Sequence, residues 1–203
     1  YFIQVADLIE KSGIAEPLHL LDVGCANGWF INYLGNRFPN YEYTGIDIFD
    51  EFLDDARRFI PKATFTNQSM LKPASAPTKQ YDIVTALAVM QILNDTEISK
   101  LFNFLFDSVK TGGRLYLFAP FNEHGIDVVL KYRHHLDGGA SEWFPGGNAF
   151  SFETLNELIS HRCQNYKIHS FDIGMELPKT DDPRRGWTMK TEKTDFQMIN
   201  GLK

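Results

Sequence analysis

A turn of small residues follows an apolar run near the start of the chain. The run over residues 19–23 is apolar and β-branched enough to form a buried strand. The sequence GCANG follows over residues 24–28, and apolar residues then recur with the period of a helix. Glycine permits positive φ and close approach of a ligand, and the first turn of a helix presents free N–H groups. The segment therefore predicts a nucleotide-binding turn.

A single acid ends the next predicted strand. Residues 41–48 read as that strand, with Asp47 at its end. Ligands of open parallel sheets bind beyond the carboxyl ends of the strands, so Asp47 is expected to accept hydrogen bonds from both hydroxyls of a ribose. A nicotinamide-dependent oxidoreductase would carry the same acid, but the turn lacks the G-x-G-x-x-G spacing of such enzymes.

Strands and helices are predicted to alternate along the chain. The expected strands cover 19–23, 41–48, 63–67, 81–87, 114–119, 166–173 and 187–191, the last with a hairpin to 196–199. The expected helices cover 1–11, 29–37, 50–60, the segment between Asn94 and Gly112, and 152–159. This alternation predicts a doubly wound, three-layer α/β fold with a seven-stranded, mostly parallel sheet and an antiparallel last strand.

Length and composition favour one domain over residues 1–203. The formal net charge of −6 gives no global field for nucleic acid or anionic lipid. Cys25 and Cys163 stand far apart, which predicts neither a disulfide framework nor a metal site and fits a reducing cytoplasm. No signal peptide is visible, and the most apolar run, 83–93, is too short to span a bilayer. We therefore expect a cytoplasmic protein with no membrane or nucleic-acid partner and no indication of its oligomeric state.

Four ordered segments resemble motifs of the class I S-adenosylmethionine-dependent methyltransferases. LLDVGCANG resembles their first motif, YTGIDI their second, YDIVTALAVMQIL their strand-four motif and VKTGGRLYLFAP the entry to strand five. The resemblance covers roughly residues 19–120 and extends more loosely to the last strands. It implies a Rossmann-like fold and S-adenosyl-L-methionine as cofactor. The strand-four segment lacks the Asn/Asp-Pro-Pro-aromatic signature of nucleic-acid N-methylases and the acids of metal-dependent catechol methylases.

The resemblance assigns residues to the methionine moiety of that cofactor. Asp22 would order the turn and approach the amino group through water or main chain, and the carbonyl of Leu87 would accept from the same amine. The turn would pass beneath the methionine, with alanine in place of the usual middle glycine. Its members are Gly24, Cys25, Ala26, Asn27 and Gly28.

Further residues would hold the adenosine. Asp47 would bind the ribose, Ile48 would pack on the adenine, and Ser69 and Met70 would flank it. Ser69, or Gln68 beside it, stands where many members of the family have an adenine-binding aspartate.

The acceptor side is expected to come from residues 120–150, a substrate-binding or lid insertion. A segment this long without strong periodicity is usually functional in a compact domain. A hydroxyl acceptor needs a base near its oxygen, and His124 is the first candidate, with His134 and His135 as alternatives. Trp143 and Phe144 are interpreted either as pocket walls or as the core of a lid.

A second rim is expected from the loop 174–186, where Arg184 and Arg185 would bind an anionic group of the acceptor or remain solvated. The function predicted is methyl transfer to a small molecule at a hydroxyl. The alternatives are N- or C-methylation, a nicotinamide-dependent oxidoreductase, and a cofactor-binding protein without catalysis.

Overall fold

The structure is a computed structural model that describes residues 1–14, 18–72, 80–136, 139–163, 165–169, 187–190 and 195–198. The chain divides into two compact units, one made of 1–120 with 129–148 and the other of 121–128 with 149–203. Each unit is described by itself below. The single domain over 1–203 stays a prediction.

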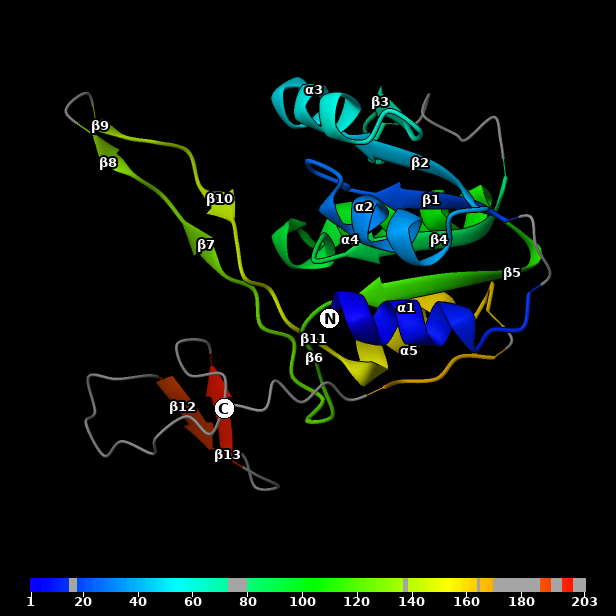
Figure 1. Cartoon of the computed structure of the whole chain (residues 1–203). Helices are drawn as coiled ribbons and strands as arrows, with labels where there is room; N and C mark the ends of the chain where they lie inside the picture. Colours follow the sequence, from blue (N-terminus) through cyan, green and yellow to red (C-terminus); the bar gives the residue numbers. More distant parts are fainter. Residues whose placement is uncertain are drawn as a thin grey trace. The chain divides into compact units, whose positions relative to one another are not determined.

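The first unit is built on a five-stranded parallel sheet (Figure 1). Its strand order is β3-β2-β1-β4-β5, which places the first strand in the middle and reverses the direction of winding beside it. The strands are β1 (His19–Val23), β2 (Glu42–Asp47), β3 (Thr64–Asn67), β4 (Tyr81–Leu87) and β5 (Val109–Phe118). Because neighbouring strands run parallel, β1, β2 and β4 all end at one edge of the sheet.

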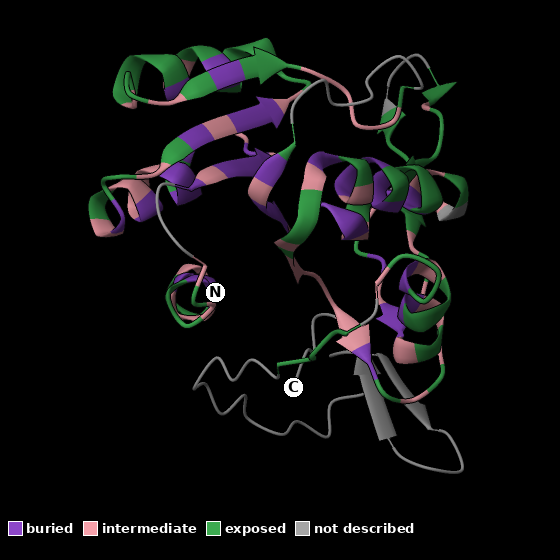
Figure 2. Cartoon of the chain, turned by 90° about the vertical axis from the view of Figure 1, so that its right-hand side faces the viewer, coloured by how far each residue is buried: buried purple, intermediate pink, exposed green. Residues whose placement is uncertain are grey.

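Four helices accompany this sheet, and apolar periodicity explains their buried faces. They are α1 (Phe2–Glu10), α2 (Trp29–Arg37), α3 (Asp50–Phe59) and α4 (Asp95–Ser108). Buried side chains of α1, α2 and α3 form one cluster with Leu20, Tyr43 and Ile83 of the strands. Burial is concentrated on the central strands β1 and β4, which Figure 2 shows largely in purple, whereas β5 has only half-buried and exposed residues. Helix α4 begins with a capping box between Asn94 and Glu97.

Residues 129–148 contribute a β-hairpin to the first unit. We call residues 130–147 the arm; Figure 1 shows it as a two-stranded ribbon. In it, β7 (Lys131–Tyr132) pairs antiparallel with β10 (Phe144–Pro145), and β8 (His135–Leu136) pairs with β9 (Gly139–Ala140). The sequence predicted a functional segment here without regular structure, so the paired strands are a correction.

The second unit contains a short parallel pair and a helix. Strand β6 (Phe121–Asn122) pairs with β11 (Phe150–Ser151), which runs directly into α5 (Phe152–Ile159). The Asp127 carboxylate joins these pieces, since Oδ1 accepts from Ser151 N at 2.7 Å and Oδ2 accepts from Thr154 Oγ1 at 2.6 Å. The Ser151 side chain caps α5, since its Oγ accepts from Thr154 N.

The doubly wound parallel sheet is confirmed, and five of its strands lie among the described residues. Strand β5 begins at Val109, earlier than predicted. Its pairing with β4 shifts register between Tyr81 and Ile83, and the pair Gly112-Gly113 lies in this irregular part of the strand instead of ending the helix before it. Residues 166–169 are not a strand, and the rest of the strand predicted over 166–173 lies outside the described residues. The last predicted strand is β12 (Trp187–Lys190), which pairs antiparallel with β13 (Asp195–Met198) in a two-stranded sheet of its own. None of the helices that the structure describes has the length and apolar character needed to cross a membrane.

Candidate functional site

The turn after β1 contains three residues with positive φ: Gly24 at 71°, Ala26 at 46° and Gly28 at 78°. The N–H groups of Gly24 and Cys25 both donate to the carbonyl of Ile46, at 2.8 and 3.0 Å. Gly28 donates to the carbonyl of Cys25 at 2.9 Å and is the N-cap of α2. These bonds fold the main chain back against the end of β2, so the predicted strand–turn–helix is confirmed.

Glycine at both ends of this turn is required by conformation and by space. A Cβ on Gly24 would lie 2.5 Å from Cγ2 of Val89, which follows β4. A Cβ on Gly28 would lie 2.8 Å from Cδ1 of Ile60 and 3.0 Å from the Phe65 ring. Any larger residue would therefore push the turn off its neighbours, in addition to the strain of positive φ.

Ala26 is strained at the middle of the turn because alanine carries a Cβ at φ 46°. We expect Ala26→Gly to raise the free energy of unfolding by about 0.5–1 kcal/mol, measured by urea denaturation. The matched control is Ala63→Gly, at a half-buried position outside the positive-φ set, where glycine is expected to destabilise by about 0.5–1 kcal/mol. Equal losses in the two variants would contradict the assignment of strain to Ala26.

The Asp47 carboxylate holds the turn through main-chain hydrogen bonds. Its Oδ2 accepts from Ala26 N at 2.9 Å, and its Oδ1 accepts from Ile48 N at 2.7 Å and Phe49 N at 3.1 Å. Three of about four lone-pair sites are thus engaged by the chain itself. Asp47 therefore shapes the turn as well as standing beside it, a role that sequence reasoning missed.

Asp22 is a buried carboxyl in the middle of the sheet. Its side chain is 3% exposed, and Oδ1 accepts from Thr85 Oγ1 at 2.6 Å across the β1–β4 pair. Burial raises the pKa of Asp22 from 3.8 to about 7; the Thr85 hydrogen bond opposes this rise and the negative charge of Asp47 adds to it. Sequence reasoning missed Thr85, although a hydroxyl within the apolar run 81–87 is a signal that it needs a partner.

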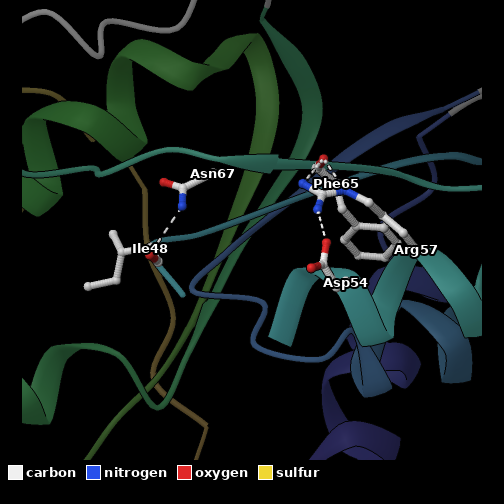
Figure 3. Close-up of polar contacts among 5 residues, drawn as sticks. All are labelled: Ile48, Asp54, Arg57, Phe65 and Asn67. Carbon is white, nitrogen blue, oxygen red and sulfur yellow. Dashed lines mark hydrogen bonds and ion pairs between the residues drawn. The ribbon is translucent and has the colours of Figure 1, made fainter. Parts of the chain in front are cut away.

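Side-chain contacts also fix the ends of β2 and β3 (Figure 3). Asn67 Nδ2 donates to the Ile48 carbonyl at 3.3 Å. On the helix side, Arg57 donates through Nε and Nη2 to the Phe65 carbonyl at 3.3 and 3.1 Å and pairs with Asp54 at 2.7 Å. Ile48 itself remains 53% exposed, which leaves apolar surface next to Asp47.

Ser69 and Met70 follow β3, where they were predicted to flank a base. Both are half-buried, and Ser69 Oγ accepts from Leu71 N at 3.3 Å. Leu87 ends β4 and is half-buried, while the next residue, Ala88, has φ 58° and donates to the Phe118 carbonyl at 2.8 Å. The roles of Ser69, Met70 and Leu87 in binding stay predictions.

Cys25 and Asn27 complete the turn. Burial raises the pKa of the Cys25 thiol, with Asp22 and Asp47 adding to the rise, so the sulfur stays protonated and is no nucleophile at neutral pH. Asn27 is half-buried. Both residues remain predicted members of the cofactor site.

The candidate bases lie on two different parts of the chain. His134 and His135 are exposed on the arm, where the His134 ring packs against Tyr132 and Phe144. His124 belongs to the second unit and is half-buried; its backbone N–H donates to Asn122 Oδ1 at 3.0 Å. Their role as bases stays a prediction.

The aromatic candidates lie on the arm. Trp143 and Phe144 are exposed there at 58% and 43%, so each offers apolar contact surface, and their role as pocket walls stays a prediction. Arg184 and Arg185 lie outside the described residues.

Comparisons with known proteins find similar sequences and a similar fold. Residues 20–113 match the family model described as "Methyltransferase domain". The trans-aconitate 2-methyltransferase of Paracidovorax citrulli is 30% identical over 116 residues, which are 57% of this chain and 44% of that protein. A malonyl-[acyl-carrier protein] O-methyltransferase of Ilyobacter polytropus is 27% identical over 88% of this chain and 64% of its own length. The chain thus spans about half to two thirds of these relatives.

Solved structures share the fold. CalS10, an amino pentose methyltransferase from Micromonospora echinaspora, has a TM-score of 0.59 at 20% identity, covering 79% of this chain and 80% of that one. This likeness shows that the chain has the Rossmann-like methyltransferase fold, and the match of residues 20–113 supports a class I S-adenosylmethionine-dependent methyltransferase within that fold.

Proposed function

We propose that the chain binds S-adenosyl-L-methionine and transfers its methyl group to an oxygen atom of a small-molecule acceptor. The observation that supports this most strongly is the turn over residues 24–28, folded onto β2 and held by the Asp47 carboxylate. The curated relatives above are named for transfer to trans-aconitate and to a malonyl-loaded carrier protein, and both are acidic acceptors.

The residues at this edge fit the cofactor. Asp47 Oδ2 keeps a lone-pair site beyond its bond to Ala26, enough for a hydrogen bond from one ribose hydroxyl rather than the two expected from sequence. Exposed Ile48 offers an apolar surface for the adenine, followed by Ser69 and Met70. The turn would lie beneath the methionine, with Asp22 behind it and the Leu87 carbonyl facing the amine.

Bound in this way, the cofactor supplies a sulfonium methyl group: the carbon–sulfur bond breaks, a carbon–oxygen bond forms, and sulfur keeps the electron pair. The chain contributes alignment and exclusion of water, because charge is dispersed in this displacement. A hydroxyl acceptor also loses a proton, which we assign to His124, with His134 or His135 as alternatives. A carboxylate acceptor is already ionised and needs no base, which makes it the second candidate.

We expect Asp47→Ala to weaken binding of S-adenosylhomocysteine about 10- to 100-fold, since charge-assisted hydrogen bonds contribute about 1.5–3 kcal/mol. Isothermal titration calorimetry measures the dissociation constant. The control is Asp50→Ala, an acid in the first turn of α3. Unchanged affinity in the Asp47 variant, with the unsubstituted protein binding, would remove Asp47 from the site.

The activity is tested with cofactor that carries a labelled methyl group and a panel of hydroxylated, amino and carboxylate acceptors that includes trans-aconitate. Label recovered in an ester or ether supports the proposal. Label recovered on a nitrogen or carbon atom would show that this atom, and not oxygen, accepts the methyl group. Binding of the cofactor without transfer to any class would favour a binding protein, and binding of NAD instead would favour an oxidoreductase.

A further inference from the structure

Asn148 connects both strands of the arm to the loop that follows β4. It is fully buried. Its Nδ2 donates to the Leu93 carbonyl at 2.6 Å and its backbone N–H donates to the Gln91 carbonyl at 2.9 Å. Its Oδ1 accepts from Leu130 N at 2.8 Å, at the start of the arm. One buried side chain therefore satisfies main-chain groups from two segments that are distant in sequence.

The same loop packs on the glycine turn. Val89 Cγ2 lies 2.5 Å from the place that a Cβ on Gly24 would occupy, so the Val89 side chain packs against the main chain of the turn at Gly24. Between Val89 and Leu93 the chain forms a tight 3₁₀ turn, Met90–Ile92, with hydrogen bonds from Ile92 N to the Val89 carbonyl and from Leu93 N to the Met90 carbonyl. A continuous set of contacts thus runs from Gly24 through this turn to Asn148.

The arm itself has few stabilising contacts away from its base, where Leu130 and Asn148 are bonded. Two-stranded hairpins are marginally stable in water, and this one buries little. Tyr132 faces Phe144 in the ladder, with their ring centroids 5.7 Å apart, and both remain about half exposed. Arg133 lies 4.9 Å from the Trp143 ring centroid. The bonds of Asn148, together with the bond from Gly146 N to the Leu130 carbonyl at 3.0 Å, therefore fix the base of the arm.

We propose that Asn148 is a positioning residue that couples occupancy of the glycine turn to order in the arm. This inference rests on the proposed function, because the ligand of the turn is the adenosyl cofactor. A ligand lying over Gly24 restricts the turn and Val89, and the short 3₁₀ segment passes this restriction to the carbonyls that bind Asn148. The arm, with its exposed aromatic side chains, is thereby held at the sheet edge where the acceptor must meet the methyl group.

Hydrogen exchange of the full chain, read by mass spectrometry with and without S-adenosylhomocysteine, tests this coupling. We expect saturating S-adenosylhomocysteine to slow exchange in peptides from the arm by about fivefold or more, the lower end of ordinary allosteric couplings. In Asn148→Ala this slowing is lost, while the calorimetric affinity of the turn for the ligand stays within about threefold. Exchange in the arm that is unaffected by bound ligand in the unsubstituted protein would overturn the inference and leave the proposed function intact.

The matched control is Asn122→Ala. Asn122 is also buried and bonds main-chain groups of Ile126, Phe150 and His124, but all of them lie in the second unit. The slowing is expected to survive in this variant. If Asn148→Ala does not fold, Val89→Ala takes its place, since it removes the side-chain contact with Gly24 and keeps the hydrogen bonds of Asn148. Slowing of exchange in the arm by the ligand that persists in Val89→Ala would overturn the coupling. Failure of the unsubstituted protein to bind S-adenosylhomocysteine would instead overturn the proposed function, and the inference with it.

Discussion

Gly24→Ala is expected to lower the free energy of unfolding by about 2–5 kcal/mol and to abolish measurable cofactor binding. Two costs combine. Alanine at φ 71° is strained by about 1–2 kcal/mol, and its Cβ would lie 2.5 Å from Val89 Cγ2 in a packed region. Relief of this close contact requires either the turn or the loop after β4 to move, and such a movement displaces the main chain on which the cofactor would lie. Urea denaturation and calorimetry with S-adenosylhomocysteine measure the two effects.

Gly13→Ala is the matched control. Gly13 has φ 68°, and its Cβ would meet nothing within 4 Å, so alanine there is expected to show only the conformational strain. The double variant Gly24→Ala/Val89→Ala should recover part of the lost stability because it makes room for the new methyl group. A Gly24 variant no less stable than the Gly13 variant, or one that keeps its ligand affinity, would contradict the close packing of the turn on Val89.

The stability of the protein is expected to fall by about 2–4 kcal/mol between pH 4 and pH 7 because of Asp22. In the unfolded chain this carboxyl ionises above its usual pKa of 3.8, whereas burial keeps it protonated in the folded chain up to about pH 7. Over this window the unfolded state therefore loses a proton that the folded state retains, and the balance shifts toward unfolding as the pH rises. Above pH 7 both states are ionised and the effect is constant.

Asp22→Asn isolates this contribution. The amide is neutral at every pH and its oxygen can still accept from Thr85, so the variant should lack the fall between pH 4 and 7. The difference between the two denaturation series cancels the contributions of all other titratable groups, which the two proteins share. Asp82 and Asp127 do not interfere, because hydrogen bonds and, for Asp82, Lys110 lower their pKa values and confine their losses to more acidic solutions. Parallel pH profiles for the two proteins would show that Asp22 is ionised in the folded state.

The parts of the fold that local patterns predict are those with strong hydrophobic signals. The run over 81–87 is apolar enough to be a parallel strand covered on both faces, and it is β4. The turn over 24–28 follows from its small residues, and Asp47 from its place at the end of a strand. Each of these predictions needed only neighbours in the sequence or the regular geometry of a parallel sheet.

Residues that act through distant partners were not predictable in this way. Asn148 lies in a segment without strong periodicity, and its partners Gln91 and Leu93 follow a strand far earlier in the chain. Likewise, nothing near Asp47 in the sequence indicates that Ala26 donates to it. The sequence of the arm does contain one signal, the dipeptide Asp137-Gly138, which is typical of two-residue hairpin turns.

The central claim is that an adenosyl cofactor lies on the turn over residues 24–28, beside Asp47. A crystal structure of the chain with S-adenosylhomocysteine tests it most directly. We expect the ligand across the ends of β1 and β2, with a ribose hydroxyl within hydrogen-bonding distance of Asp47 Oδ2, the adenine against Ile48 and the amino acid portion over Gly24. A ligand bound elsewhere on the chain, or no ligand at a concentration that saturates binding in solution, would contradict the claim.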